Sequence, residues 1–431
     1  MKSGRKQAVM NVTQAVNNAA RTILILGLLA WGQGSCLARA DSLEGNSCIS
    51  CHEDYWGEMK NSIHSQHGVY CNDCHGGDAS KSDEAAAKDA AAGFIGVPDK
   101  KTLVEMCGSC HADVETMNFY GIRTDQLARY KTSRHGKKLF QEGDDNVAGC
   151  SDCHGYHDVL KVGDPASPVY PLNLPKTCNH CHGNEKLMSK YGLPSDVFDK
   201  YASSVHGQAL FEKGDLSAAH CARCHGSHGA VPPGVKDIST TCGKCHLNEE
   251  KYFLDSVHAG IAQKGKFSQC VSCHGHHAIT HADPSLYASA CQKCHESGGT
   301  AMETGDKIAG MLALSVKKLD SAEKMISRAG IEGIYVEEEE GLLEKARTHA
   351  VSMAPRQHSL LINEISEIYE KFEEITGDIE KKIRLKKQHL KWRRGALVPI
   401  WIFIIIMMTA LWKKYKLLKR EKEEKSDGTN G

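Results

Sequence analysis

The clearest pattern of hydrophobic and polar positions lies in the last third of the chain, where apolar residues recur at helical spacing. The stripe consists of Leu342, Ala346, His349 and Met353, followed by His358, Leu361, Ile365, Ile368, Phe372, Ile375 and Ile379. It predicts helices near 301–328 and 336–353 and a long helix from near Gln357, separated by glycine and proline. The acidic run at 337–340 is interpreted as a solvated helix start, where negative charge is favourable.

Two uninterrupted apolar runs lie near opposite ends of the chain. The run at 397–412 is close to the length that spans a bilayer and is flanked by basic residues. It predicts a transmembrane helix over 395–413 and a tail over 414–431; the alternative is a buried helix of a soluble protein. The run at 22–31 precedes Ala38-Arg39-Ala40 and predicts a secretory signal peptide over 1–40, with an uncleaved anchor as the alternative.

Between these ends, a five-residue motif, C-x-x-C-H, occurs nine times and uses 18 of the 19 cysteines. In such a motif two thiols attach to haem and the histidine becomes the proximal iron ligand. Zinc sites and disulfide frameworks do not require a histidine after each second cysteine. We therefore predict nine covalently attached haem c groups. The attachment residues are Cys48, Cys51, Cys71, Cys74, Cys107, Cys110, Cys150, Cys153, Cys178, Cys181, Cys221, Cys224, Cys242, Cys245, Cys270, Cys273, Cys291 and Cys294. The proximal ligands are His52, His75, His111, His154, His182, His225, His246, His274 and His295.

The motifs form repeats. The landmarks of the repeat that opens at Cys107 return 71 residues later in the repeat that opens at Cys178. Shortened copies open at Cys48 and Cys242, and a lone motif opens at Cys291. Repeats of this kind predict stacked equivalent units. An alanine-rich segment at 83–92 interrupts the pattern and predicts a short helix or a mobile insertion.

The array from about Asn46 to His295 resembles the multihaem c-type cytochromes with doubled motifs, a group that includes the octahaem hydroxylamine oxidoreductases and tetrathionate reductases. The resemblance implies haems in contact along one continuous chain, with short helices at the motifs and loops elsewhere. We therefore expect a mainly α fold with much irregular loop. It would comprise a multihaem cytochrome c domain over 41–300, a helical segment over 301–394 and one transmembrane helix.

Histidines outside the motifs are candidates for the distal iron ligands. A repeated Ser-x-His placement gives four candidates, and a C-H-G-x-H placement gives three. In the cytochromes that this chain resembles, both placements supply distal ligands to neighbouring haems. With two helical histidines, nine candidates match nine irons: His64, His135, His206, His258, His157, His228, His277, His349 and His358. His67 is a spare, and the alternative for the two helical histidines is a role in the core.

Two imidazoles on every iron would leave no site for a substrate, so we expect an electron carrier with no catalytic residue. Because haem c is attached outside the cytoplasm, the haem domain is expected in the periplasm, tethered to the cytoplasmic (inner) membrane by one C-terminal pass. The expected partners are a membrane quinol-oxidising subunit, such as a cytochrome b, and periplasmic cytochromes or reductases. The alternative is a multihaem oxidoreductase, hydroxylamine oxidoreductase-like or reducing nitrite or sulfur oxyanions, with one five-coordinate haem. Zero formal net charge gives no indication of a nucleic-acid partner.

Overall fold

The computed structural model describes residues 46–232 and 238–427. Helices joined by turns and loops make up these residues, and no strand occurs among them, which confirms the predicted fold class. The predicted signal peptide over 1–40, including Cys36, lies outside the described residues.

The chain divides into two compact units, and each is described by itself. The first unit holds the chain up to Phe198 together with Ala209–Val231, and the second holds Asp199–Gln208 together with the chain from Pro232 on. The first unit therefore carries six of the nine motifs and the second carries three.

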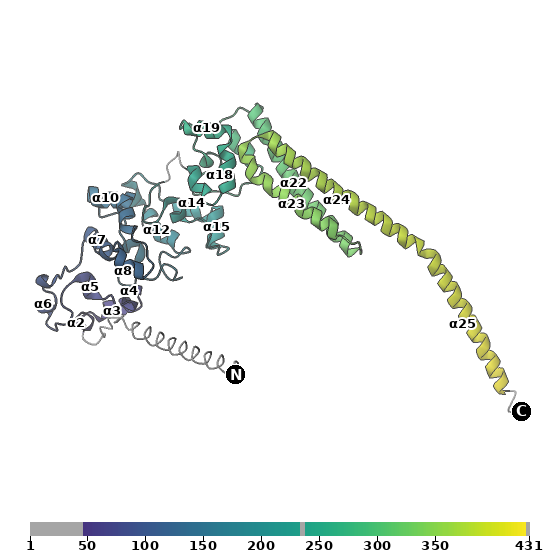
Figure 1. Ribbon diagram of the computed structural model, residues 1–431, viewed down its shortest axis with the longest axis horizontal. Helices are drawn as coiled ribbons and strands as arrows, with labels where there is room; N and C mark the ends of the chain where they lie inside the picture. Colours follow the sequence, from purple (N-terminus) through teal and green to yellow (C-terminus); the bar gives the residue numbers. More distant parts are fainter. Residues whose placement is uncertain (1–45, 233–237, 428–431) are drawn as a thin grey trace, which may run out of the picture. The chain divides into compact units, whose positions relative to one another are not determined.

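Short helices dominate the first unit (Figure 1). They are α2 (Ser47–Cys51), α3 (Glu53–Met59), α4 (Ile63–Gln66), α5 (Cys71–His75), α6 (Glu84–Ala87), η1 (Ala90–Ala92), α7 (Lys100–His111), α8 (Val114–Phe119), α9 (Gln126–Thr132), α10 (Arg134–Glu142), α11 (Ser151–His154), α12 (Leu174–His182), α13 (Glu185–Ser189) and α16 (Cys221–His225). Two more, α14 (Val197–Ala202) and α15 (Val205–Phe211), contribute residues to both units. The alanine-rich segment forms α6 and η1, in agreement with the predicted short helix.

The second unit begins with short helices and ends with long ones. They are α17 (Ile238–Gly243), α18 (Leu247–Leu254), α19 (Val257–Gln263), α20 (Cys270–His274), α21 (Leu286–Cys291), α22 (Thr300–Ile331), α23 (Glu337–Arg356), η3 (Gln357–Ser359), α24 (Ile362–Ala396) and α25 (Val398–Asp427). The three helices predicted from the apolar stripe correspond to α22, α23 and α24.

The motif-bearing part has small apolar cores. One cluster in the first unit is built from Val104, Tyr130, Leu139 and Val147, with the Tyr130 hydroxyl donating to the carbonyl oxygen of Ala148 at 2.8 Å. Such clusters bury few large side chains for the length of chain that they serve. A bound apolar group would supply the missing buried surface.

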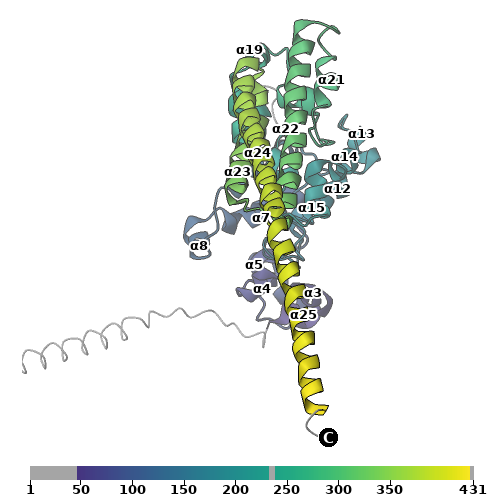
Figure 2. The same cartoon turned by 90° about the vertical axis from the view of Figure 1, so that its right-hand side faces the viewer.

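By contrast, α22, α23 and α24 pack along one another with a continuous apolar core (Figure 2). Its buried members are Ala322, Ile326, Ala329, Ile334, Leu343, Ile379 and Ile383. The residues from α22 follow one another at steps of four and three, and the two from α24 are four residues apart, which places each set on one helix face. Leu343 comes from α23, and Ile334 lies between α22 and α23. The apolar periodicity of the sequence therefore explains how these helices associate.

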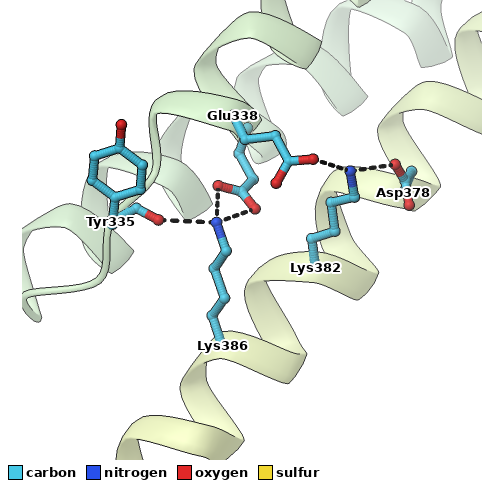
Figure 3. A network of polar contacts seen from close by, with 6 residues as sticks. Tyr335, Glu338, Asp378, Lys382 and Lys386 are labelled. Carbon is cyan, nitrogen blue, oxygen red and sulfur yellow. Dashed lines mark hydrogen bonds and ion pairs between the residues drawn. The ribbon is translucent and has the colours of Figure 1, made fainter.

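Ion pairs join α23 to α24 beside this core (Figure 3). Lys386 Nζ lies 2.7 Å from the Glu339 carboxylate and donates to the carbonyl oxygen of Tyr335 at 3.0 Å. Lys382 Nζ lies 2.6 Å from Glu338 and 3.2 Å from Asp378. The Glu339 side chain is 0% exposed, so the interpretation of 337–340 as wholly solvated is wrong at this position. A cation from the neighbouring helix compensates its buried charge.

One helical stretch, Ile362–Lys422, is long and apolar enough to cross a membrane. Its most apolar window is not buried by the rest of the chain, and Phe403 and Trp412 are among its exposed side chains. Such exposure of large apolar residues is compatible with a lipid environment. This helix contains the segment at 395–413 that the sequence predicts to span the membrane.

Candidate haem centres

The C-x-x-C-H motifs lie on helices or at their C-terminal ends. Complete motifs form α5, α16 and α20, whereas α7 and α12 end with theirs. In a helix, residues three and four positions apart lie on one face. Both cysteines and the histidine of such a motif can therefore approach one ligand from the same side.

The serine of each Ser-x-His placement lies immediately before a short helix and is buried. Ser133 accepts a hydrogen bond from the Gly136 amide at 2.9 Å, and Ser204 accepts one from the Gly207 amide at 3.1 Å. Ser62 caps α4 by accepting a hydrogen bond from the Ser65 amide at 3.1 Å, whereas Ser256 precedes α19 and its hydroxyl donates to the carbonyl oxygen of Phe253 instead. Capping by serine sets where the helix begins, and the histidine consequently occupies its second position. Sequence analysis identified these histidines but not the reason for the serine.

Gly136, directly after His135, permits a close approach between two helices. A Cβ atom at this position would lie 1.9 Å from the carbonyl oxygen of Tyr130. Gly207, the equivalent residue after His206, would bring a Cβ atom 2.1 Å from the carbonyl oxygen of Tyr201. The backbone directly after both histidines therefore lies in contacts that leave no room for a side chain.

A repeated backbone hydrogen bond connects three of the four Ser-x-His helices to the following repeat. The Arg134 amide donates to the Ala230 carbonyl at 3.0 Å, and the Ile63 amide donates to the Val159 carbonyl at 2.8 Å. In the second unit, the Val205 amide donates to the Ile279 carbonyl at 2.8 Å. Each acceptor lies five residues after the histidine that closes a repeat. Neighbouring repeats are thus held in the same register, which the sequence pattern did not reveal.

Seven proximal histidines lie opposite a second histidine from the candidate set. Ring centroids in these pairs are 6.1 to 6.3 Å apart. The pairs are His111 with His64, His75 with His157, His182 with His135, His154 with His228, His246 with His206, His295 with His258, and His274 with His358. The structure thus places the proximal histidines opposite histidines from the Ser-x-His placement, from the C-H-G-x-H placement, and opposite His358 from the predicted helical stripe.

This separation fits a metal ion held between two imidazoles. With metal–nitrogen bonds of about 2 Å and a ring nitrogen roughly 1 Å from each ring centre, the two centres would lie about 6 Å apart. In every pair, one histidine belongs to a C-x-x-C-H motif and the other comes from outside it. The residues present therefore fit haem iron with a protein ligand on each face.

Backbone hydrogen bonds orient several of these imidazoles. His75 Nδ1 lies 2.8 Å from the carbonyl oxygen of Gly96, and His358 Nδ1 lies 2.9 Å from that of Pro355. His225 Nδ1 makes a similar contact with Val231 at 3.3 Å. Because a carbonyl only accepts, Nδ1 carries the proton and Nε2 keeps its lone pair for a metal.

Burial favours the neutral form of the distal candidates. It lowers the pKa of His64, His135, His206 and His258 below the ordinary value, because desolvation disfavours the charged imidazolium. Burial, with a smaller contribution from His228, lowers the pKa of His154 to about 4. Metal binding requires the neutral form, so these environments suit iron ligation.

Cysteines of successive motifs also lie together. The side chains of Cys107 and Cys150 lie close together within one repeat, and those of Cys178 and Cys221 lie close together within the next. Between repeats, burial and the neighbouring Cys107 raise the pKa of Cys74 to about 11. The first cysteines of paired motifs therefore adjoin, and adjacent repeats remain close.

The other candidate ligands lie in different surroundings. The exposed His52 contacts Tyr55, with ring centroids 6.1 Å apart, and the exposed His67 contacts Tyr120, with centroids 5.0 Å apart. The rings of His276 and His277 lie 5.1 Å apart. His349 is half-buried on α23, and its carbonyl oxygen accepts a hydrogen bond from Ser352 at 2.8 Å. Ligand roles for His52, His225, His277 and His349 remain predictions.

Comparison with known proteins agrees with the motif chemistry. Residues 63–183 match the family model of cytochrome c3, and this stretch contains four C-x-x-C-H motifs. No curated protein and no solved structure matches the chain. The match supports a multihaem c-type cytochrome, in which haem c is covalently bound and electrons are transferred.

Proposed function

We propose that all nine C-x-x-C-H motifs carry haem c, and that the seven histidine pairs are the axial ligands of seven of these haems. The observation that carries this proposal is the near-identical spacing of the pairs, 6.1 to 6.3 Å, in both units. Haem supplies an iron centre that gains or loses one electron. The surrounding imidazoles and backbone carbonyls hold that centre in place and tune its potential.

Electron transfer along each unit follows from how the chain places its attachment cysteines. Paired motifs adjoin at Cys107 and Cys150, at Cys178 and Cys221, and in the second unit at Cys242 and Cys270. Attachment sites this close hold their haems within range for electron transfer. With an imidazole on both faces of an iron, no position is left for a substrate.

The proposed setting is the cytoplasmic (inner) membrane, with the haem domain in the periplasm and α25 as a single C-terminal pass. Support comes from the exposed apolar side chains of α25 and from the export signal predicted over 1–40. The chain would relay electrons between a membrane quinol-oxidising partner, such as a cytochrome b, and periplasmic cytochromes or reductases. Within this proposal we retain the resemblance to the octahaem hydroxylamine oxidoreductase and tetrathionate reductase group.

A haem count and a quinol assay test the proposal. Full-length protein made with the machinery for haem c attachment is expected to carry nine haems by pyridine haemochrome. In membranes that contain a quinol-oxidising cytochrome b, added quinol should reduce them rapidly. The matched control is a chain that stops after Ala396, which keeps every motif and lacks the proposed anchor. Fewer than nine haems would contradict haem attachment at all nine motifs. Equally fast reduction of the truncated chain would contradict the role of the membrane anchor in accepting electrons from quinol.

A further inference from the structure

We infer that the turn between α22 and α23, residues 331–336, rests on the membrane surface as a second contact beside α25, and that the lipid it meets carries anionic head groups. This inference rests on the proposed membrane span of α25. It goes beyond that proposal, because a single span does not require the helical segment to touch the bilayer.

The turn is fixed beside the last part of α24. Lys387 Nζ lies 2.8 Å from the Glu332 carboxylate, and Arg394 donates to the carbonyl oxygen of Glu332 at 3.1 Å. Arg394 is three residues before Leu397, where the apolar run begins. The helical rise between these two positions is about 4.5 Å. The contacts therefore hold the turn at the level where the proposed span starts.

Apolar side chains of the turn point outward. Ile331 is 85% exposed and Tyr335 is 72% exposed, whereas Ile334 between them is buried in the core of α22, α23 and α24. The Tyr335 carbonyl oxygen accepts the hydrogen bond of Lys386, and its ring points away from that contact (Figure 3). A backbone held in place by α24 thus presents two large apolar side chains to the surroundings, and their removal from water is favourable.

The turn lies at the end of α22 that is remote from the motifs. Near the other end, a Cβ atom at Gly305 would lie 3.1 Å from the side chain of Tyr287, which belongs to the helix that carries Cys291. At about 1.5 Å per residue, α22 rises about 39 Å from Gly305 to Ile331. A haem at Cys291 therefore does not reach the turn, and the exposed surface there belongs to the helical segment itself.

Positive charge is concentrated at the same level of the chain. Residues 381–396 contain eight lysines and arginines and no acidic residue. Of the five acidic residues in the turn and the first helical turn of α23, three are paired with lysines of α24. Lys391, Arg393 and Arg394 are exposed and lie nearest to the apolar run. Such a cluster attracts anionic lipid head groups.

Trp392 marks the interface independently of the turn. It is 76% exposed on α24 and lies five residues before Leu397. Tryptophan and tyrosine concentrate at membrane–water interfaces, where the ring meets lipid and the polar group stays hydrated. Trp392 and Tyr335 both lie close to the start of the apolar run, where this preference applies. Contacts made by the span and by the turn would together fix the angle of the helical segment on the membrane.

The test measures how fast a charged, water-soluble maleimide alkylates introduced cysteines in full-length, haem-loaded protein. The protein is placed in nanodiscs of phosphatidylethanolamine and phosphatidylglycerol, and the haem count is measured on each sample, because a missing haem would leave reactive motif cysteines. Ile331→Cys should react roughly tenfold more slowly than the control Val316→Cys, because lipid contact removes this apolar position from water.

Val316 is a matched control. It is 68% exposed on the same helix and lies about 22 Å from Ile331 along the axis. In the absence of lipid contact, position 331, which is 85% exposed, would react at least as fast as position 316. Met408→Cys, at a position in α25 that is 64% exposed, reports on the span separately and should be protected.

The outcomes separate this inference from the proposed span. Protection at position 408 with fast reaction at position 331 would overturn the inference and leave the span intact. Fast reaction at position 408 would show that the span itself has failed, and the inference would fall with it. Protection at position 331 that vanishes when each nanodisc holds one copy of the chain would assign the turn to a second copy and would also overturn the inference.

The lipid composition tests the charge. In nanodiscs of phosphatidylcholine alone, the protection at position 331 should weaken severalfold, because the basic residues lose their anionic partners. Equal protection in both lipids would overturn the assignment to anionic head groups.

Discussion

His154 and His228 lie opposite one another with ring centroids 6.1 Å apart and ring planes only 4° from parallel. They belong to different repeats, yet they lie in one unit and are brought together by the register that the Arg134–Ala230 hydrogen bond maintains. If the proposed ligation holds, a haem attached in one repeat is completed by the next.

Replacing His228 by methionine should therefore change one haem without removing it. Methionine opposite histidine raises the reduction potential of a haem relative to two histidines. A potentiometric titration of H228M should show one haem shifted to higher potential and an unchanged haem count. His180→Gln, at an exposed histidine inside a motif, is the control and should leave the titration unaltered. An unaltered titration for H228M would contradict the assignment.

Ser133→Ala should destabilise the helix that carries His135. The serine is 1% exposed and accepts the hydrogen bond of the Gly136 amide, so its loss removes a buried cap. The expected loss in the free energy of unfolding is about 1 kcal/mol, measured by denaturant titration of the haem-loaded protein. Thr132→Ala alters the exposed neighbouring residue and should lower the free energy of unfolding much less. Equal effects of the two substitutions would argue against the capping role.

Gly136→Ala should be far more disruptive than an ordinary glycine substitution. The new Cβ would lie 1.9 Å from the Tyr130 carbonyl oxygen, and displaced backbone in a packed site costs about 3 kcal/mol. Low yield and incomplete haem loading are the expected signs, measured by haemochrome and unfolding. Gly163→Ala, where a Cβ meets no atom within 4 Å, should behave like the wild type. Normal loading of G136A would show that the helices can separate.

Lys386→Met should weaken the contact between α23 and α24. It leaves the Glu339 carboxylate buried without its cation, at an expected cost of about 2 to 3 kcal/mol. Lys387→Met removes a 2.8 Å ion pair with Glu332 whose side chains are both partly exposed, and should cost less than about 1 kcal/mol. Thermal unfolding followed by circular dichroism measures both. The double variant K386M and E339L, which removes both charges, should recover much of the lost stability.

Local patterns in the sequence identified most of the candidate site. The motif itself, the two histidine placements and the helical stripe depend on residues close together in the chain. The structure places His64, His135, His206, His258, His157, His228 and His358 opposite proximal histidines. The helices α22, α23 and α24 likewise follow the predicted apolar periodicity.

Features that depend on distant contacts could not be predicted in this way. The acidic run at 337–340 gives no sign that Glu339 is buried, because Lys386 comes from another helix. The amide of Ile63 likewise meets the carbonyl of Val159 only after folding. His349 lies on the helix that the apolar stripe predicts. The stripe alone does not specify which residue of another element lies opposite a given position.

The hydrogen bond from Ile63 to Val159, repeated at Arg134 and Val205, has a consequence for how such a chain could evolve. In the proposed ligation, neighbouring repeats supply each other with axial histidines, so duplication or loss would be tolerated only in whole modules. A partial insertion would shift every later histidine away from its partner. Lengthening the chain by such modules would add redox centres inside the array without disturbing the pairs that already exist.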